Sequence, residues 1–313
     1  MASQIDELVT GQSETATRNG VLAGVLAFSM WGAFPIYFQI AGDVSAVEML
    51  LHRIVWSVPF GAMIILARRQ WPQVRTAMLD RRTLGFLTLS ALFITLNWLV
   101  YTWAVQNSQI FQASLGYYIN PLVLIIVGFM FFGERLRAMQ VAAVILAAAG
   151  VAVLTISGGQ FPFISLTLAF SFTIYSVVRK QVVVGAMPGL FVETLILFPV
   201  SAVILYYLIA TGPSPFTPEN PRMMALLLLA GPLTVLPLLF FAVSARRLKL
   251  STIGFLQFIG PTGQFVVGYY YGEELTWPHL ICFAFIWLAV ILFIFDVWYS
   301  GRNSMPAVAI HVE

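Results

Sequence analysis

Apolar residues fill ten long stretches of the chain, and short polar segments separate them. Each stretch is continuously apolar over about 20 residues, the length that an α-helix needs to cross a lipid bilayer. The strands of a membrane β-barrel would instead alternate apolar and polar positions over about 10 residues. The pattern therefore predicts ten transmembrane helices, at residues 20–41, 46–67, 84–106, 111–132, 137–157, 160–180, 189–210, 223–245, 252–272 and 277–298.

The composition agrees with an all-α polytopic membrane protein. Of the 313 residues, 60% are hydrophobic and only 9% are charged, whereas a soluble globular chain is about half apolar and about a quarter charged. Ten spans leave no room for a sizeable soluble domain. Because Cys282 is the only cysteine and the three histidines lack a metal-binding spacing, we expect no intrachain disulfide, no metal and no cofactor.

Lysine and arginine residues lie almost entirely on one side of the predicted helices. If the N-terminus is cytoplasmic, 14 of the 16 basic residues fall in cytoplasmic segments; Arg222 lies outside and Arg53 lies within a span. The positive-inside rule then predicts that the polar tails 1–19 and 299–313 are both cytoplasmic. This bias explains the basic net charge without a nucleic-acid partner. The basic loop from Arg68 to Arg82 is interpreted as a solvated loop, with a segment lying on anionic headgroups as the alternative.

Short sequence matches relate the two halves of the chain. The matched pairs are Leu26–Ser29 with Leu168–Ser171, Glu48–Leu50 with Glu193–Leu195, Ile119–Pro121 with Ile259–Pro261, and Gly133–Glu134 with Gly272–Glu273. They predict two repeats of five helices, at residues 20–157 and 160–298. An odd number of helices inverts the second repeat in the bilayer. Inverted repeats characterise many secondary transporters, whose binding sites lie between the repeats near mid-membrane.

Several segments closely resemble those of the RarD proteins, which belong to the EamA branch of the drug/metabolite transporter superfamily. These segments are Glu48–Arg53, Asn97–Trp98, Ala113–Leu122, Gly133–Arg135 and Ser251–Thr262. The resemblance covers residues 20–300, and Ala113–Leu122 is its most specific part. It implies a bacterial inner-membrane permease with ten helices in two inverted five-helix repeats. It also implies export of small molecules as the usual activity.

Charged side chains inside predicted spans are candidates for transport, because charge in the bilayer interior is costly. Glu48, Arg53 and Glu193 are in this position. Glu48 and His52 are four residues apart and share a helical face, whereas Arg53 points elsewhere and needs a partner on another helix. Arg53 either binds an anionic or polar substrate, or serves as a structural ion pair or a snorkelling anchor.

Glu48 and Glu193 occupy equivalent places in the two repeats, at opposite mouths of the predicted bundle. One hypothesis is that each carboxylate takes up a proton when its mouth closes, because a low-dielectric environment disfavours the charged form. His52 would share the proton at the first mouth, since histidine titrates near neutral pH. The alternative is that both glutamates only stabilise helix N-termini.

Further candidates are polar or aromatic residues expected near a central cavity. With Glu48, His52 and Arg53, the candidate cavity residues are Asn97, Trp98, Tyr101, Tyr117, Asn120 and Gln257. Trp98 and Tyr101 either stack an aromatic or cationic solute or only pack. Pro121 and Pro261 are repeat equivalents that interrupt their helices, either as hinges for alternating access or as static kinks.

Together these features favour a secondary transporter that exports small metabolites or drug-like solutes by alternating access, with or without proton coupling. A passive facilitator and an uptake permease remain alternatives. An intramembrane enzyme is disfavoured, because no nucleophile–base motif or metal-ligand motif is visible in the sequence. The small residues of 140–157 predict close helix packing, either within the monomer or in a homodimer.

Overall fold

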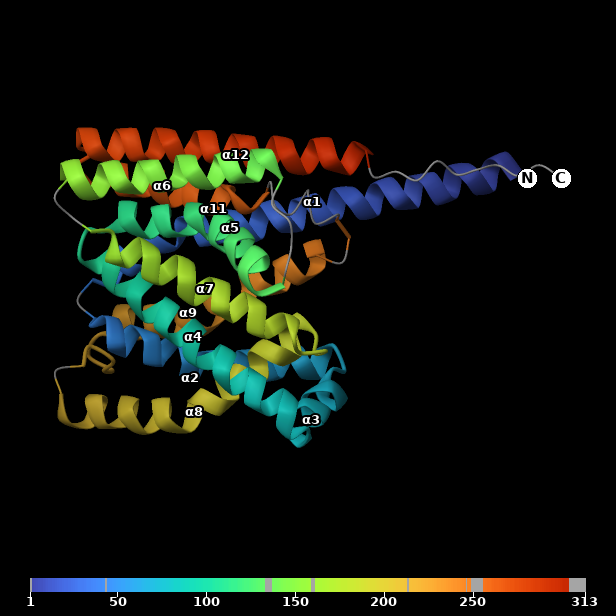
Figure 1. Cartoon of the computed structure of the whole chain (residues 1–313). Helices are drawn as coiled ribbons and strands as arrows, with labels where there is room; N and C mark the ends of the chain where they lie inside the picture. The colour runs from blue at the N-terminus through green and yellow to red at the C-terminus, as the bar shows by residue number, and fades with distance from the viewer. Residues whose placement is uncertain are drawn as a thin grey trace. The chain divides into compact units, whose positions relative to one another are not determined.

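The computed structural model describes residues 2–42, 44–132, 137–158, 161–212, 214–245, 247–248 and 256–303. In this part of the chain the regular elements are α-helices (Figure 1). They are α1 (Ala2–Ile40), α2 (Ala46–Ala67), α3 (Trp71–Leu79), α4 (Arg81–Gln106), α5 (Ile110–Phe132), α6 (Ala138–Gly158), α7 (Phe163–Lys180), α8 (Ala186–Thr211), α9 (Pro221–Ala245), α11 (Ile259–Tyr270) and α12 (Trp277–Asn303).

The chain is a polytopic helical membrane protein. Within the described ranges, eight segments are long and apolar enough to cross a bilayer: Thr17–Ile40, Ala46–Ala67, Arg81–Gln106, Ile110–Phe131, Ala138–Ser157, Ala186–Thr211, Pro221–Ser244 and Trp277–Asp296. The other two predicted spans fall on α7, whose apolar part is shorter, and on α11, which the structure describes from Ile259. Three predicted features lie outside the described residues: the Gly133–Arg135 motif, Ser251–Phe255, and the end of the C-terminal tail from residue 304.

Two segments differ from the sequence-based expectation. α1 begins at Ala2, so the polar tail 1–19 is largely helical and continues into the first span. The basic loop contains the nine-residue helix α3, which presents Val74 and Ala77 to a buried cluster with Ile65 and Phe191. The interpretation of this segment as a solvated loop is therefore wrong, because its two apolar positions, three residues apart, pack on one helical face.

The described helices form two compact units, and each draws on both sequence repeats. Residues 1–120 with 163–274 make the first unit, and residues 121–162 with 275–313 make the second. The chain passes from one to the other within α5, between Asn120 and Pro121.

In the first unit, α2 packs between α8 and α9, α4 packs on α7, and α1 packs on α9 and α11. Glycines allow two of these helix pairs, and the pair α5 with α7, to approach closely. Gly32 of α1 faces Gly263 of α11, Gly116 of α5 faces the carbonyl of Ser165, and Gly231 of α9 faces the backbone of Trp56. Small residues at such contacts are typical of helix association in membranes.

In the second unit, α6 and α12 lie side by side (Figure 1). Gly150 of α6 faces the carbonyl of Cys282 and the side chain of Phe285. Arg137 and Asp296 form an ion pair at 2.8 Å. The small-residue face predicted for residues 140–157 therefore packs against another helix of the same chain.

Glu273 joins two helices of the first unit. Gly272 has a φ of +79° and, together with Glu273, closes α11 through backbone bonds to Tyr269 and Gly268, which form a Schellman motif. The Glu273 carboxylate accepts hydrogen bonds from the backbone N–H groups of Ile110 and Phe111, at the start of α5. The next helix, α12, begins four residues after Glu273, at Trp277.

Burial raises the pKa of Glu273 above its ordinary value, and the two N–H donors lower it less. Because the folded state holds the proton more tightly than the unfolded state, this carboxyl stabilises the fold most at low pH, and the contribution declines as the pH rises through the folded pKa. The melting temperature of the wild type should therefore exceed that of Glu273→Gln by a larger margin at pH 5 than at pH 8. If the difference in melting temperature between the wild type and Glu273→Gln increased with pH, the raised pKa of Glu273 would be contradicted.

Candidate functional site

A buried arginine lies among four helices of the first unit. Arg53 of α2 is 3% exposed, and its Nε donates to Thr234 Oγ1 of α9 at 3.1 Å. Its Cζ lies 4.5 Å from the ring centroid of Trp98 (α4), 5.5 Å from that of Phe38 (α1) and 5.9 Å from that of Phe34 (α1). Arg53 Nη1 has no hydrogen-bond partner, and no carboxylate of the described residues lies within ion-pair distance of its side chain.

The environment of Arg53 matches neither of the structural roles expected for it. The side chain is buried, so it does not snorkel to water. Its positive charge meets aromatic faces and a hydroxyl group, and no ion pair is formed in the described part of the chain. The Trp98 ring, for which stacking on a solute and packing were the two alternatives, is covered by the protein's own guanidinium.

Two tyrosines and an asparagine continue this cluster on α4 and α5. The Tyr117 hydroxyl donates to Asn97 Oδ1 at 2.9 Å, and the Tyr101 and Tyr117 rings meet edge-on at 5.7 Å. Asn97 Nδ2 donates to the carbonyl of Leu168 and to Ser171 Oγ, both at 3.0 Å. The amide of Asn97 is thus occupied by protein groups, whereas the buried Tyr101 hydroxyl has no partner.

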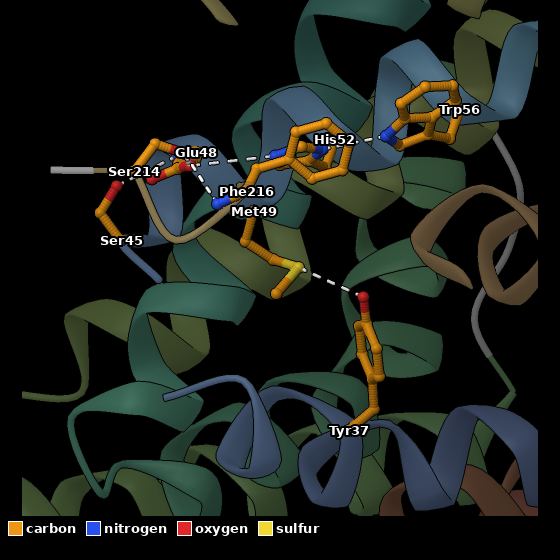
Figure 2. A network of polar contacts seen from close by, with 8 residues as sticks. All are labelled: Tyr37, Ser45, Glu48, Met49, His52, Trp56, Ser214 and Phe216. Carbon is orange, nitrogen blue, oxygen red and sulfur yellow. Dashed lines mark hydrogen bonds and ion pairs between the residues drawn. The ribbon is translucent and has the colours of Figure 1, made fainter. Parts of the chain in front are cut away.

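A polar network occupies about the first three turns of α2. Figure 2 shows Glu48, His52 and Trp56 in succession along this helix. The Ser214 hydroxyl donates to Glu48 Oε1, and His52 Nε2 lies 3.9 Å from the same oxygen. Trp56 Nε1 donates to His52 Nδ1 at 2.9 Å, which leaves Nε2 as the protonated nitrogen of a neutral ring. The Phe216 ring lies 4.8 Å from the His52 ring, so the segment before α9 covers this network.

Glu193 of α8 forms a separate buried cluster. The residue is 0% exposed, and its Oε1 accepts from Ser90 Oγ at 2.5 Å and lies 3.5 Å from Arg179 Nε. It is the eighth residue of α8, beyond the first turn where a helix dipole stabilises an anion. The capping alternative therefore does not apply to Glu193. It remains for Glu48, which lies in the first turn of α2 behind the N-cap residue Ser45.

Glu48 of α2 and Glu193 of α8 lie beside different levels of α2. Gly61 of α2 is in contact range of Phe191, two residues before Glu193, so the start of α8 lies beside the end of α2. Glu48 precedes Gly61 by thirteen residues, a rise of about 20 Å at 1.5 Å per residue. Arg53 lies between these levels.

The remaining candidates lie outside the Arg53 cluster. Asn120 Nδ2 donates to the carbonyl of Ala169 and to Thr173 Oγ1, both at 3.0 Å, so it binds α5 to α7. Half-buried Gln257 ends a helical turn, and a turn at Phe258 separates it from α11. Pro261 is the third residue of α11, where a proline removes no internal helix hydrogen bond. Pro121 lies inside α5.

Several residues of these clusters escaped sequence analysis. They are Phe34, Phe38 and Thr234 beside Arg53, Ser214 and Phe216 beside Glu48 and His52, and Ser90 and Arg179 beside Glu193. Arg179 is one of the 14 basic residues of the predicted cytoplasmic segments, where the positive-inside rule explains it fully. The other residues are ordinary components of apolar helices and loops. Within the described part of the chain, no group of three or more histidine, cysteine or acidic residues is arranged to hold a metal ion.

Comparison with known proteins identifies related chains. The model of the EamA-like transporter family matches residues 18–156. The chain is 45% identical to protein RarD of Salmonella typhimurium, over 92% of this chain and 98% of that protein. It is 42% identical to an uncharacterized transporter of Vibrio cholerae, over 93% of this chain and 96% of that protein. A protein of known crystal structure shares the fold with a TM-score of 0.57, at 20% identity over 93% of this chain and 99% of that chain.

Proposed function

Because the chain belongs to the EamA-like transporter family, as a RarD-like permease of the bacterial inner membrane, we propose that it is a secondary transporter that exports small metabolites or drug-like solutes by alternating access. The observation that carries the proposal is the position of the buried Arg53 on α2, between the level of Glu48 and the level of Gly61, about 20 Å further along the helix, where the Glu193 end of α8 lies beside it. A solute site between two separately controlled mouths is what alternating access requires.

The pairing of helices in the first unit supports two inverted repeats. If α1, α2, α4 and α5 correspond to α7, α8, α9 and α11, then the α4–α7 contact corresponds to α9–α1. The contact of α5 with α7, made by Ser165 and Gln112, likewise corresponds to that of α11 with α1. The α2–α8 contact joins two equivalent helices, so exchanging the repeats leaves it unchanged. Such exchanged pairing is expected of a pseudo-two-fold axis, and with the lysine and arginine bias it favours ten spans with both termini cytoplasmic.

The two polar clusters would act as gates in this proposal. At one mouth, Ser214 and Phe216 lie on Glu48 and His52, so opening requires the segment before α9 to leave them. At the other mouth, opening requires Ser90 and Arg179 to release Glu193. Glu48 can take up a proton, and His52 can share it once Trp56 releases His52 Nδ1, which offers a route for coupling transport to a proton gradient.

Flux from proteoliposomes loaded with a ¹³C-labelled bacterial metabolite extract tests this function. An inward proton gradient should drive net release of particular solutes, measured by mass spectrometry. Glu48→Gln should reduce the gradient-driven release by about tenfold or more, as expected when a general acid–base group is removed. Glu219→Gln, which changes an exposed carboxylate, should release solutes at the wild-type rate.

Each failure in this experiment has a distinct meaning. Gradient-driven release that survives Glu48→Gln would remove Glu48 from coupling. Release that never depends on the gradient would identify a facilitator. If the wild type released no solute, or converted one chemically, transport itself would be rejected.

A further inference from the structure

We propose that Arg53 recognises the carboxylate of a monoanionic solute whose remaining body is apolar or aromatic, and that Arg53 Nη1 and the Tyr101 hydroxyl are the two donors that bind it. This inference rests on the proposed function, because it names the substrate class of the same transport path.

The first support is a charge that the protein does not neutralise. A buried ion without a counterion is costly, and a buried structural arginine is normally paired with a carboxylate. Arg179 illustrates the usual arrangement in the same compact unit, since its Nε lies 3.5 Å from Glu193. Arg53 is more deeply buried and has no such partner within the described ranges. Its aromatic neighbours offset only part of this cost.

The second support is the set of hydrogen-bond donors around the guanidinium. Phe38, which faces the Arg53 guanidinium, also contacts the rings of Tyr37 and Tyr101, and the Tyr101 ring contacts that of Tyr117. Tyr37 donates its hydroxyl hydrogen to the carbonyl of Leu226, and Tyr117 donates to Asn97. The Tyr101 hydroxyl and Arg53 Nη1 are both buried and without a partner. Two unsatisfied donors match the two oxygens of one carboxylate, and charge-assisted hydrogen bonds of this kind are strong.

The aromatic side chains near Arg53 and Tyr101 indicate the chemical character of the rest of the solute. Phe34, Phe38 and Trp98 lie against the guanidinium. Phe38 and Tyr117 also lie against the Tyr101 ring. These surfaces favour an apolar or aromatic body over a heavily hydrated one. One cation neutralises one negative charge, so a phosphate dianion would bring an unpaired charge into the same buried environment. A monocarboxylate is therefore the matching class.

Thermal unfolding of the full-length protein in lipid nanodiscs tests the site. The probes are benzoate and hexanoate, with benzamide, hexanamide and inorganic phosphate as controls at matched ionic strength. The two carboxylates should raise the melting temperature, by on the order of 3 °C at ten times their Kd, whereas the amides and phosphate should not. Arg53→Gln should abolish the shift, Arg53→Lys should keep part of it, and Arg222→Gln, which removes an exposed arginine, should leave it unchanged.

The melting temperature measured without any added ligand distinguishes a binding role of Arg53 from a structural role. If Arg53 serves recognition, Arg53→Met should melt at or above the wild-type temperature, because it removes an unpaired buried charge and leaves no carboxylate behind. A lower melting temperature for Arg53→Met, or equal shifts with benzoate and benzamide, would overturn the inference.

Flux from the loaded proteoliposomes distinguishes this inference from the proposed function. Released solutes should be enriched in monocarboxylates, and Arg53→Gln should lose their release. If the wild type and Arg53→Gln release neutral or cationic solutes equally and release no monocarboxylate, the inference fails while the transporter stands. If benzoate binding requires Arg53 but no solute is released, the inference stands and the proposed function fails.

Discussion

Replacing Arg179 with methionine should destabilise the protein by about 3–5 kcal/mol, the cost of breaking a buried ion pair from one side. Glu193 is 0% exposed, and Arg179 is the cation that lies beside its carboxylate. With the arginine removed, Ser90 would remain as the hydrogen-bond donor to Glu193 Oε1. One hydroxyl does not replace a cation beside a buried carboxylate, so the folded state loses most of the compensation for burying this charge.

Adding the replacement Glu193→Gln tests whether the loss of stability comes from the contact between Arg179 and Glu193. In the Arg179→Met background it should recover most of the loss, because it removes the uncompensated charge and keeps an acceptor for Ser90. Arg222→Met, at an exposed arginine, is the matched control and should change stability little. The measurement is reversible denaturant unfolding in detergent micelles. If Arg179→Met cost no more than Arg222→Met, the contact with Glu193 would contribute nothing to folding.

Hydropathy was sufficient to locate the helices but not the partners of their charges. Continuous apolar length predicted α2, α6 and α8, because crossing a bilayer imposes a length on each helix. The same signal missed α3, which has only nine residues and is stabilised by the packing of Val74 and Ala77. A hydropathy scale, which sums apolar residues along the chain, does not detect a short helix that depends on tertiary contacts.

The site could be predicted only in part, for a related reason. A charged residue within an apolar stretch identified Arg53 and Glu193 from the sequence alone. The face that Arg53 meets comes from Phe38, Trp98 and Thr234 on three other helices, and helical periodicity carries no information about which helices become neighbours. Arg179 was harder still, because its place at a helix end already had a sufficient explanation in topology.

Arg53 and Arg179 therefore illustrate opposite balances of charge. Arg179 and Glu193 compensate each other inside the protein, so removing one partner should harm the fold. Arg53 has aromatic rings and a hydroxyl but no anion among the described residues, so removing it should spare the fold and harm recognition. Measuring both the stability and the solute release of variants at Arg53 and Arg179 therefore distinguishes residues that stabilise the helix bundle from residues that bind the transported solute.

Gly231→Ala should also be strongly destabilising, although it adds a single methyl group. Gly231 of α9 packs against the α2 backbone: an added Cβ would overlap the carbonyl group of Trp56 and would lie 2.8 Å from the nitrogen of Ser57. Backbone atoms cannot rotate away as a side chain does, so the helices must separate. Overpacking of this kind costs about 1–3 kcal/mol and sometimes more.

The same replacement at Gly85 is the matched control. Gly85 lies in α4 with nothing within 4 Å of an added Cβ, so alanine there should stabilise the protein by up to about 1 kcal/mol through its helix propensity. Denaturant unfolding of the two variants should therefore show shifts of opposite sign. Because α2 also carries Arg53, whose bond to Thr234 of α9 crosses the same contact, Gly231→Ala should weaken benzoate binding as well. Equal stability of the two alanine variants would contradict the close backbone contact between α2 and α9.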